Sequence, residues 1–239
     1  MKKIILIFLF AFPVLFYGQY SGNGFGVSIN YNYTSSSELF TFPNSPDRIL
    51  RTISVPLESV YGPSVDFRYR ILNEIVIGFN FEQMKKRIGV RRATLGTPIG
   101  VVSTRVQDEY TIYPVEFNIF YLVPFSTESF KFHFGGGFGL YFGNHKIYFD
   151  EYPGLELKND SKDFAYGIQV STGMDYMVNN YFSIRGEMRF RDPELQMENT
   201  DGSRRIEHNG QMFIIPQEIL ESKINIDGVT FTIGMVLHF

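Results

Sequence analysis

Charged side chains recur at alternate positions along several segments of this sequence. Around residue 187, for example, Arg185, Glu187, Arg189 and Arg191 alternate with apolar or small residues. The full alternating set contains five acids, six bases and one histidine: Asp66, Arg68, Arg70, Glu82, Glu116, Lys131, His133, Asp175, Arg185, Glu187, Arg189 and Arg191. Acids and bases on one face can pair as salt bridges, line a path for ions or transfer protons. Which of these roles the residues have depends on the secondary structure to which they belong.

Two histidines lie in segments that also contain serines and acids, the residue types of a hydrolytic site. His145 precedes Ser161 and Asp163, and His208 follows Asp201 and Ser203. A serine nucleophile needs a base within hydrogen-bond reach, and that base needs a third group to hold it. Nothing in this spacing requires those contacts, and the absence of Cys excludes a thiol nucleophile. The sequence predicts no catalytic residue.

Metal and nucleotide chemistry have weaker support. Asp150, Glu151, Asp160 and Asp163 make one segment acidic, but they do not match an EF-hand loop. The glycine run over 135–139 fits neither the dinucleotide fingerprint nor the phosphate-binding loop pattern. Those glycines are expected to make room for long neighbouring side chains. We therefore predict no metal site and no cofactor, and the formal net charge of −3 argues against nucleic-acid binding.

The elements that carry these residues read as β-strands. Apolar side chains recur at every second position over eight stretches, at about 25–33, 65–71, 75–82, 113–121, 130–142, 164–176, 182–190 and 229–239. A period of two gives a strand one apolar and one polar face. The apolar face holds many of the 25 Phe and 15 Tyr residues, which suit a lipid-facing surface better than a closely packed sandwich core.

The connections between these strands alternate in length. Short ones fall at 72–74, 124–129 and 178–180, and long ones at 34–60, 87–108, 143–162 and 193–226. Short turns at one end and long loops at the other are typical of outer-membrane barrels, whose loops are extracellular. The fold class predicted is all-β, an eight-stranded antiparallel up-and-down transmembrane β-barrel.

In such a barrel the alternating charges face the interior. The interior of an eight-stranded barrel is just wide enough for side chains to fill it. We therefore expect a salt-bridged polar network, with His133 as one of its hydrogen-bonded members. A narrow ion pore through the same residues is the alternative.

The N-terminus has the features of a secretory signal peptide. Lys2 and Lys3 precede an apolar run from Ile4 to Tyr17, and Gly18 follows. The run contains Pro13 and is shorter than a membrane-spanning helix requires. Residues 1–18 are predicted to be removed, with the cut after residue 18 or 19, which leaves 20–239 as the barrel.

The last residues of the sequence resemble the ending of a known class of proteins. Phe231, Ile233, Met235, Leu237 and Phe239 form an amphipathic last strand that ends in Phe. This ending is similar to the assembly signal of Gram-negative outer-membrane proteins, and the mature chain resembles the small eight-stranded barrels of the OmpX and OmpA membrane-domain type.

The resemblance implies a monomer in the cell outer membrane, in contact with lipopolysaccharide and the barrel-assembly machinery. It implies a non-enzymatic, surface-exposed role in envelope integrity, adhesion or interaction, or as an accessory to a secretion system. A narrow ion pore and a barrel enzyme that modifies lipid A or phospholipid are the alternatives.

The last long connection contains an apolar cluster. Met212, Phe213, Ile214, Ile215, Ile219 and Leu220 surround Pro216. If these residues are exposed together, Phe213 and Ile215 are candidates for a partner contact. The other interpretation is that they pack over the barrel mouth as a lid.

Overall fold

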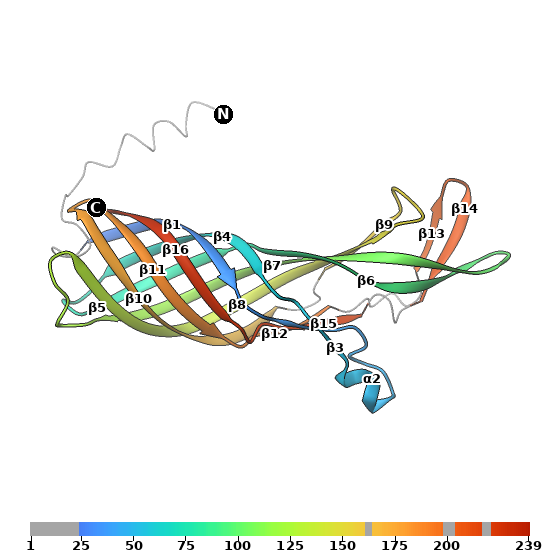
Figure 1. The fold of residues 1–239 in the computed structure, drawn as a ribbon, viewed down its shortest axis with the longest axis horizontal. Helices are drawn as coiled ribbons and strands as arrows, with labels where there is room; N and C mark the ends of the chain where they lie inside the picture. Colours follow the sequence, from blue (N-terminus) through green and yellow to red (C-terminus); the bar gives the residue numbers. More distant parts are fainter. Residues whose placement is uncertain (1–23, 161–163, 198–203, 217–220) are drawn as a thin grey trace, which may run out of the picture.

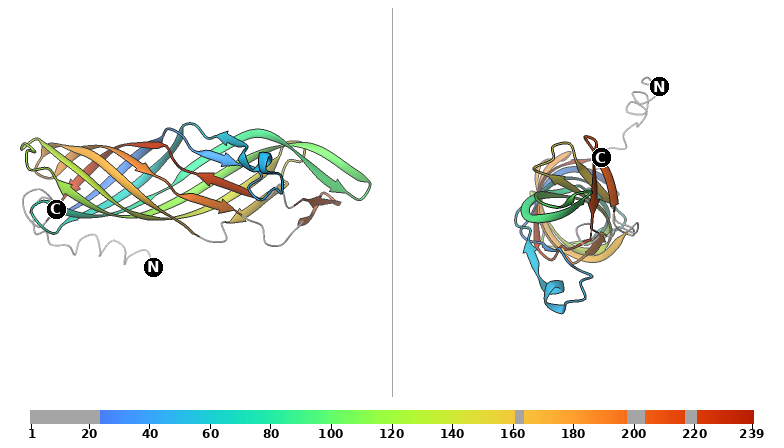
Figure 2. Two further views of the ribbon diagram at one scale, coloured as in Figure 1. Left: turned by 90° about the horizontal axis from the view of Figure 1, so that it is seen from below. Right: turned by 90° about the vertical axis from the view of Figure 1, so that its right-hand side faces the viewer.

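The computed structural model describes residues 24–160, 164–197, 204–216 and 221–239 (Figure 1). The predicted signal peptide lies outside the described residues, as do Ser161, Asp163, Asp201 and Ser203. Figure 2 shows a barrel that continues at one end into a narrower extension.

Eight strands form the barrel: β1 (Phe25–Thr34), β4 (Val60–Arg70), β5 (Ile75–Glu82), β7 (Gly100–Leu122), β8 (Phe130–Phe149), β10 (Ala165–Asn179), β11 (Phe182–Arg191) and β16 (Val229–His238). Each pairs antiparallel with its neighbour in the order β1-β4-β5-β7-β8-β10-β11-β16. The last strand returns to the first, from Gly26 opposite His238 to Thr34 opposite Thr230. The predicted closed eight-stranded antiparallel barrel is confirmed.

The two ends of the barrel differ. The turns at 71–74, 123–129 and 180–181 lie at one end, together with the paired backbones of Phe25 and Phe239. We call this the turn end and the opposite one the loop end. The faces also differ as the alternation predicts, since Ile168 on the outside is 77% exposed whereas Asp175 on the inside is fully buried.

At the loop end the chain continues as the extension. Strand β6 (Met84–Thr97) continues directly from β5 and pairs with β7 as a long hairpin, and β9 (Glu156–Asp160) pairs with the far part of β8. A second hairpin, β13 (Arg204–His208) and β14 (Gln211–Ile215), joins β6 where Ile214 lies opposite Gly96. The predicted long connections 87–108 and 143–162 therefore contain paired strands for much of their length.

The extension also contains a small second sheet. It consists of β12 (Glu194–Met197), β15 (Ser222–Asn225), β2 (Glu38–Phe40) and β3 (Ser54–Pro56), in that order. Between β2 and β3 the chain carries a short helix, α2 (Arg48–Thr52), which is held at its start by the Asp47 side chain accepting from the Ile49 amide. Helix α2 projects from the side of the molecule (Figures 1 and 2).

The inside and outside of the strands exchange polarity at the loop end of the barrel. Within the barrel, β7 points polar Glu116 and Asn118 inward and apolar Val115, Phe117 and Ile119 outward. Beyond the paired residues Tyr113 and Phe142, the same strand points apolar Ile112, Tyr110 and Val106 inward. The alternate side chains, Thr111, Glu109 and Gln107, are polar, and Glu109 is covered by the exposed Lys85 and Arg87, with which it pairs at 3.1 and 3.2 Å. Two apolar clusters fill the extension, one around Leu39, Tyr110 and Ile224, the other around Leu95, Ile147 and Phe213. The extension thus has the interior of a water-soluble domain, whereas the barrel below it has the reverse.

Candidate functional site

The half of the barrel interior nearer the turn end contains an ion-pair network centred on two arginines. Arg185 binds both carboxylate oxygens of Asp175, at 2.7 and 2.8 Å, and donates to Asp66 at 2.8 Å. Arg68 donates to Asp66 at 2.7 Å and to Glu187 at 2.5 Å. His133 lies 3.2 Å from the same Glu187 oxygen. All of these side chains are buried.

The half nearer the loop end continues the network. Arg189 links Glu187 at 2.9 Å to Glu116 at 2.6 Å, and Arg191 binds Glu116 at 3.1 Å and Glu82 at 2.8 Å. Glu187 therefore connects the two halves. Several of the pairs, such as Arg185 with Asp66 and Arg189 with Glu116, join strands that are three steps apart around the wall, so these side chains cross the interior. Buried charges are costly unless they are paired, which explains the near balance of acids and arginines here.

Arg70 and Lys131 lie at the turn-end mouth and are half-buried, whereas the charged residues of the network above are buried. Arg70 donates to the backbone oxygens of Leu72 and Asn73, at 3.2 and 2.9 Å. Both residues line a cavity of about 270 Å³ at that mouth. Alternation placed them on the inner face but gave no information on their depth.

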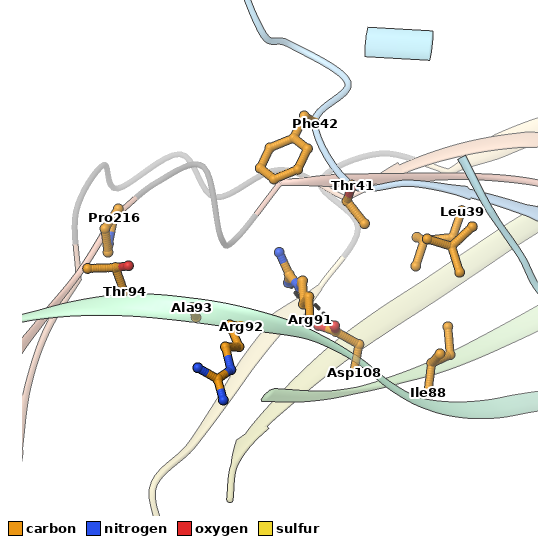
Figure 3. A pocket seen from close by; sticks show the side chains of 11 residues that line it. Leu39, Thr41, Phe42, Ile88, Arg91, Arg92, Ala93, Thr94, Asp108 and Pro216 are labelled. Atoms are coloured by element: carbon orange, nitrogen blue, oxygen red, sulfur yellow. Dashed lines mark hydrogen bonds and ion pairs between the residues drawn. The ribbon is translucent and has the colours of Figure 1, made fainter. Parts of the chain in front are cut away.

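A second polar group lies in the extension, beside a cavity of about 310 Å³ between β6 and the segment that leads to α2 (Figure 3). Leu39, Phe42, Val55 and Ile88 form its apolar lining, and Arg91 and Asp108 contribute its charges. Arg92 lies on the other side of β6 from Arg91 (Figure 3). The two residues lie on opposite sides because successive side chains of a strand point to opposite faces.

Asp108 holds two partners in this group. Arg91 binds it with two hydrogen bonds of 2.9 Å, and His145 donates to it through Nε2 at 2.7 Å. The His145 ring stacks on Tyr110, with centroids 4.2 Å apart. This group was not predicted, because 87–108 was interpreted as a loop. The continued alternation of Val106, Asp108 and Tyr110 was the signal that could have identified it.

The protonation of this group follows from its burial and pairing. Burial alone would raise the pKa of Asp108, but hydrogen bonds from His145 and Arg91 outweigh it and lower the pKa to about 2. Burial lowers the pKa of His145 more than Asp108 raises it, so the ring is neutral at neutral pH. Burial also raises the pKa of Tyr110. The arrangement is a fixed ion pair supported by a neutral imidazole.

The two loop histidines do not form a hydrolytic group with a serine among the described residues. His145 is fully buried against Asp108 and Tyr110. His208 lies near the β13–β14 turn, where its Nε2 is 3.1 Å from the Asn209 side-chain amide. In the described part of the chain, no three His, Cys, Asp or Glu residues are placed to hold a metal ion.

Phe213 and Ile215 are buried, at 1% and 0% exposure, and do not form an exposed partner contact, so that prediction is wrong for the folded extension. Both belong to the cluster around Leu95 and Ile147, and Phe213 packs edge-on against Tyr152 at 4.7 Å. The physical reason is that β14 pairs with β6 and turns these two side chains inward. Both side chains pack inside the extension. The lid interpretation likewise expected them to be packed and not exposed.

The predicted assembly residues all lie on the outer face of the closing strand or at its end. Phe231, Ile233, Met235, Leu237 and Phe239 are between 44% and 65% exposed. The Phe239 amide donates to the Phe25 carbonyl at 2.7 Å, and the Phe25 amide donates back at 3.1 Å. This placement is the geometry that a final strand with one apolar face requires.

Comparisons with known proteins found likenesses among solved structures. No protein-family profile matches the sequence, and no curated protein matches it. Similar solved structures include Ail, the attachment invasion locus protein of Yersinia pestis (13% identity, 91% of this chain and 99% of that chain, TM-score 0.45). Neisserial surface protein A is also similar (13%, 90% and 97%, TM-score 0.48). So is the outer membrane protease OmpT from Escherichia coli (10%, 90% and 96%, TM-score 0.43). Likenesses this remote carry no information about function.

None of the helices among the described residues has both the length and the apolar character needed to cross a membrane.

Proposed function

We propose that this protein is a surface-exposed, non-enzymatic barrel of the cell outer membrane, and that its extension contacts a partner molecule or surface. The exchange of polarity at Tyr113 and Phe142 carries this proposal. Side chains that face outward change there from apolar to polar, as they must where a strand leaves lipid and enters water.

The outer face of the barrel supports a membrane location. Its exposed residues are almost all large and apolar, with Ile29 at 71%, Ile168 at 77% and Ile233 at 65% exposure. An exposed apolar surface this extensive would cause aggregation in water. Tyr31, Tyr33 and Tyr61 pack together near the loop end, where an aromatic girdle is expected.

The interior supports a plugged barrel in preference to a pore. Arg185, Arg189 and Arg191 each bind carboxylates from other strands and so cross the space an ion would need. Opening a path would separate buried ion pairs, which is costly. The extension, which has its own apolar core, then performs the adhesion, interaction or envelope role, including a role as an accessory to secretion.

Sidedness can be tested with single cysteines, because the chain has no Cys of its own. Thr94 in the extension and Glu74 at the turn end are both exposed. A membrane-impermeant maleimide should label Thr94→Cys in intact cells and Glu74→Cys only after permeabilisation. Recovery of the protein in the soluble fraction, or the reverse labelling order, would contradict the proposal.

The protein recovered from the membrane fraction should also migrate differently in SDS gels before and after boiling, because a closed barrel resists unfolding. Adhesion or partner binding is then compared between cells that express the full chain and cells that lack it. A planar-bilayer recording from the purified protein tests the pore alternative, since steady single-channel conductance would contradict a plugged interior.

A further inference from the structure

A groove on the outside of the extension is lined by positive charge. It has a volume of about 350 Å³ and lies between helix α2 and the outer face of the four-stranded sheet. Its lining residues are Pro43, Arg48, Arg51, Thr52, Gln196 and Lys223. Three of these six are cationic and none is acidic.

The two arginines come from one helix face. Arg48 and Arg51 are three residues apart on α2, so their side chains are neighbours, and all residues of this helix are exposed. Among the described residues, neither guanidinium has a carboxylate within 4.0 Å. The nearby Asp47 carboxylate is engaged at the start of the helix, where it accepts from the Ile49 amide at 2.8 Å.

The sheet supplies the opposite wall. Lys223 lies opposite Gln196 on β12 and Phe40 on β2, so the three side chains form a row on one face of the sheet. Lys223 pairs with Glu194 at 3.0 Å and lies 4.7 Å from the centre of the Phe40 ring. With Glu194 and the nearby Asp47 included, three positive charges face two negative charges, a surplus of +1.

This surplus does not follow from the composition of the chain, which carries a formal net charge of −3. Two like charges at adjacent positions of a helix repel each other. A bound anion would relieve that repulsion. Guanidinium groups bind sulfate, phosphate and carboxylate through two parallel hydrogen bonds, which makes paired arginines suited to oligoanions.

The remaining lining selects the class of anion. Gln196 and Thr52 offer polar groups that suit sugar hydroxyls, whereas the described lining of the groove contains no aromatic ring on which a base could stack. The volume falls in the range of small-ligand sites. We propose that this groove binds an acidic saccharide, one that carries sulfate, phosphate or carboxylate groups. The inference rests on the proposed exposure of the extension at the cell surface and names the ligand class for it.

The test uses the full-length barrel in a non-ionic detergent at about 150 mM salt, where long-range attraction is screened. The probes are a sulfated dextran oligosaccharide and neutral dextran of equal length, titrated calorimetrically. We expect binding of the sulfated probe only, and a loss of affinity of at least tenfold in the double variant Arg48→Gln/Arg51→Gln. These side chains are exposed, so the fold should not change, and the gel mobility shift verifies this.

The matched control removes the same charge elsewhere on the extension. Arg92 and Arg105 lie opposite each other on β6 and β7, and Arg92→Gln/Arg105→Gln should change the affinity less than twofold. Equal weakening by both double variants would show non-specific attraction and overturn the site, as would absence of binding to the unaltered protein.

A second arm identifies the source of the saccharide. The phosphorylated core oligosaccharide of the host cell's own lipopolysaccharide is titrated beside the sulfated probe. Tighter binding of the core points to the cell's own envelope, and tighter binding of the sulfated probe points to a foreign surface. Either result supports the site. Because the cysteine labelling above reports sidedness without any ligand, failure of the groove and failure of the surface location are distinguishable.

Discussion

Arg191 of β11 and Glu82 of β5 lie on opposite walls of the barrel and meet across its interior, with Nη1 2.8 Å from Oε2. Four steps around the wall separate their strands in either direction, which is the largest separation that eight strands allow. A single side-chain pair therefore connects the two sides of the barrel.

Breaking this pair on one side should destabilise the barrel strongly. Arg191→Ala leaves the buried Glu82 carboxylate without its nearest cation, since Arg189 lies farther away at 3.8 Å, and loss of one partner of a buried pair costs about 3–5 kcal/mol. Urea titration followed by gel mobility measures the change, since the chain has no Trp for fluorescence. The double variant Arg191→Met/Glu82→Met should lose less than the single one. A single variant as stable as the unaltered protein would contradict the network's role.

A charged side chain on the outer face of the barrel should impair assembly more strongly the closer it lies to the middle of the membrane. Ile119 faces outward on β7 and is 52% exposed, and Arg at a midplane site costs about 2–4 kcal/mol. Ile119→Arg should lower the folded fraction in lipid vesicles. The control, Gln107→Arg, lies outward on the same strand beyond Tyr113 and should be neutral because it remains in water. Similar losses of folded protein in both variants would show that the membrane boundary inferred at Tyr113 is wrong.

Deletion of Phe239 should lower the yield of folded protein in the outer membrane without affecting export. Its backbone closes the barrel through two hydrogen bonds with Phe25. Export is measured as cleavage of the precursor, and folding as the boiling-dependent mobility shift. Phe239→Tyr keeps both the backbone and the ring and should behave as the unaltered chain. A normal folded yield from the truncated chain would refute the assembly role.

Acid should loosen the extension before the barrel. The folded-state pKa of His145 lies below its ordinary value of about 6.5 because of burial, so the unfolded state binds the proton first and stability falls as the pH drops below about 6.5. The folded-state pKa of Asp108 is about 2, so its contribution is present above about pH 4 and is lost between about 4 and 2.

Hydrogen exchange of peptides around Tyr110 and His145, corrected for intrinsic rates, measures this at about pH 7.5 and 5.5. Protection should fall at the lower pH in the unaltered protein. It should depend less on pH in His145→Gln, which has no group that titrates there. Equal pH dependence in the two proteins would exclude His145 as the cause.

Truncation of the extension core should open it while the barrel stays intact. Phe213→Ser/Ile215→Ser removes two buried apolar side chains, each worth about 2–5 kcal/mol. Limited proteolysis should then cut the extension, while the boiling-dependent mobility shift persists. The control, Met212→Ser/Ile214→Ser, changes the alternate residues of the same strand, which are 38% and 37% exposed, and should resist cleavage better. Equal resistance of the two variants would show that Phe213 and Ile215 do not hold the extension closed.

The barrel strands could be predicted because lipid outside and polar side chains inside enforce strict alternation. Val115, Phe117 and Ile119 against Glu116 and Asn118 show this clearly. Alternation also identified ten of the residues that lie in the buried network. It could not show that Arg70 and Lys131 lie at the mouth, because a pattern along one strand contains no information on distance from the mouth.

The extension was harder to predict because its strands follow different rules. Within 84–97, the residues from Lys85 to Arg92 are largely basic and their alternation is broken by the bulge before Arg91, so the segment resembled a solvated loop. The burial of Phe213 depends on pairing of β14 with β6, more than a hundred residues earlier, and a local pattern does not specify such a partner.

The exchange of polarity at Tyr113 and Phe142 has a consequence for how the protein sits in a bilayer. If β7 moved two residues along the barrel axis toward the loop end, Glu116 would still face the interior, but Tyr113 and Val115 would move from lipid into water. If it moved two residues toward the turn end, Thr111 and Glu109 would enter hydrocarbon. Both displacements are unfavourable, so the immersion depth of the barrel is fixed to about one residue. The height of every group on the extension above the lipid headgroups is then set by the sequence of this one strand.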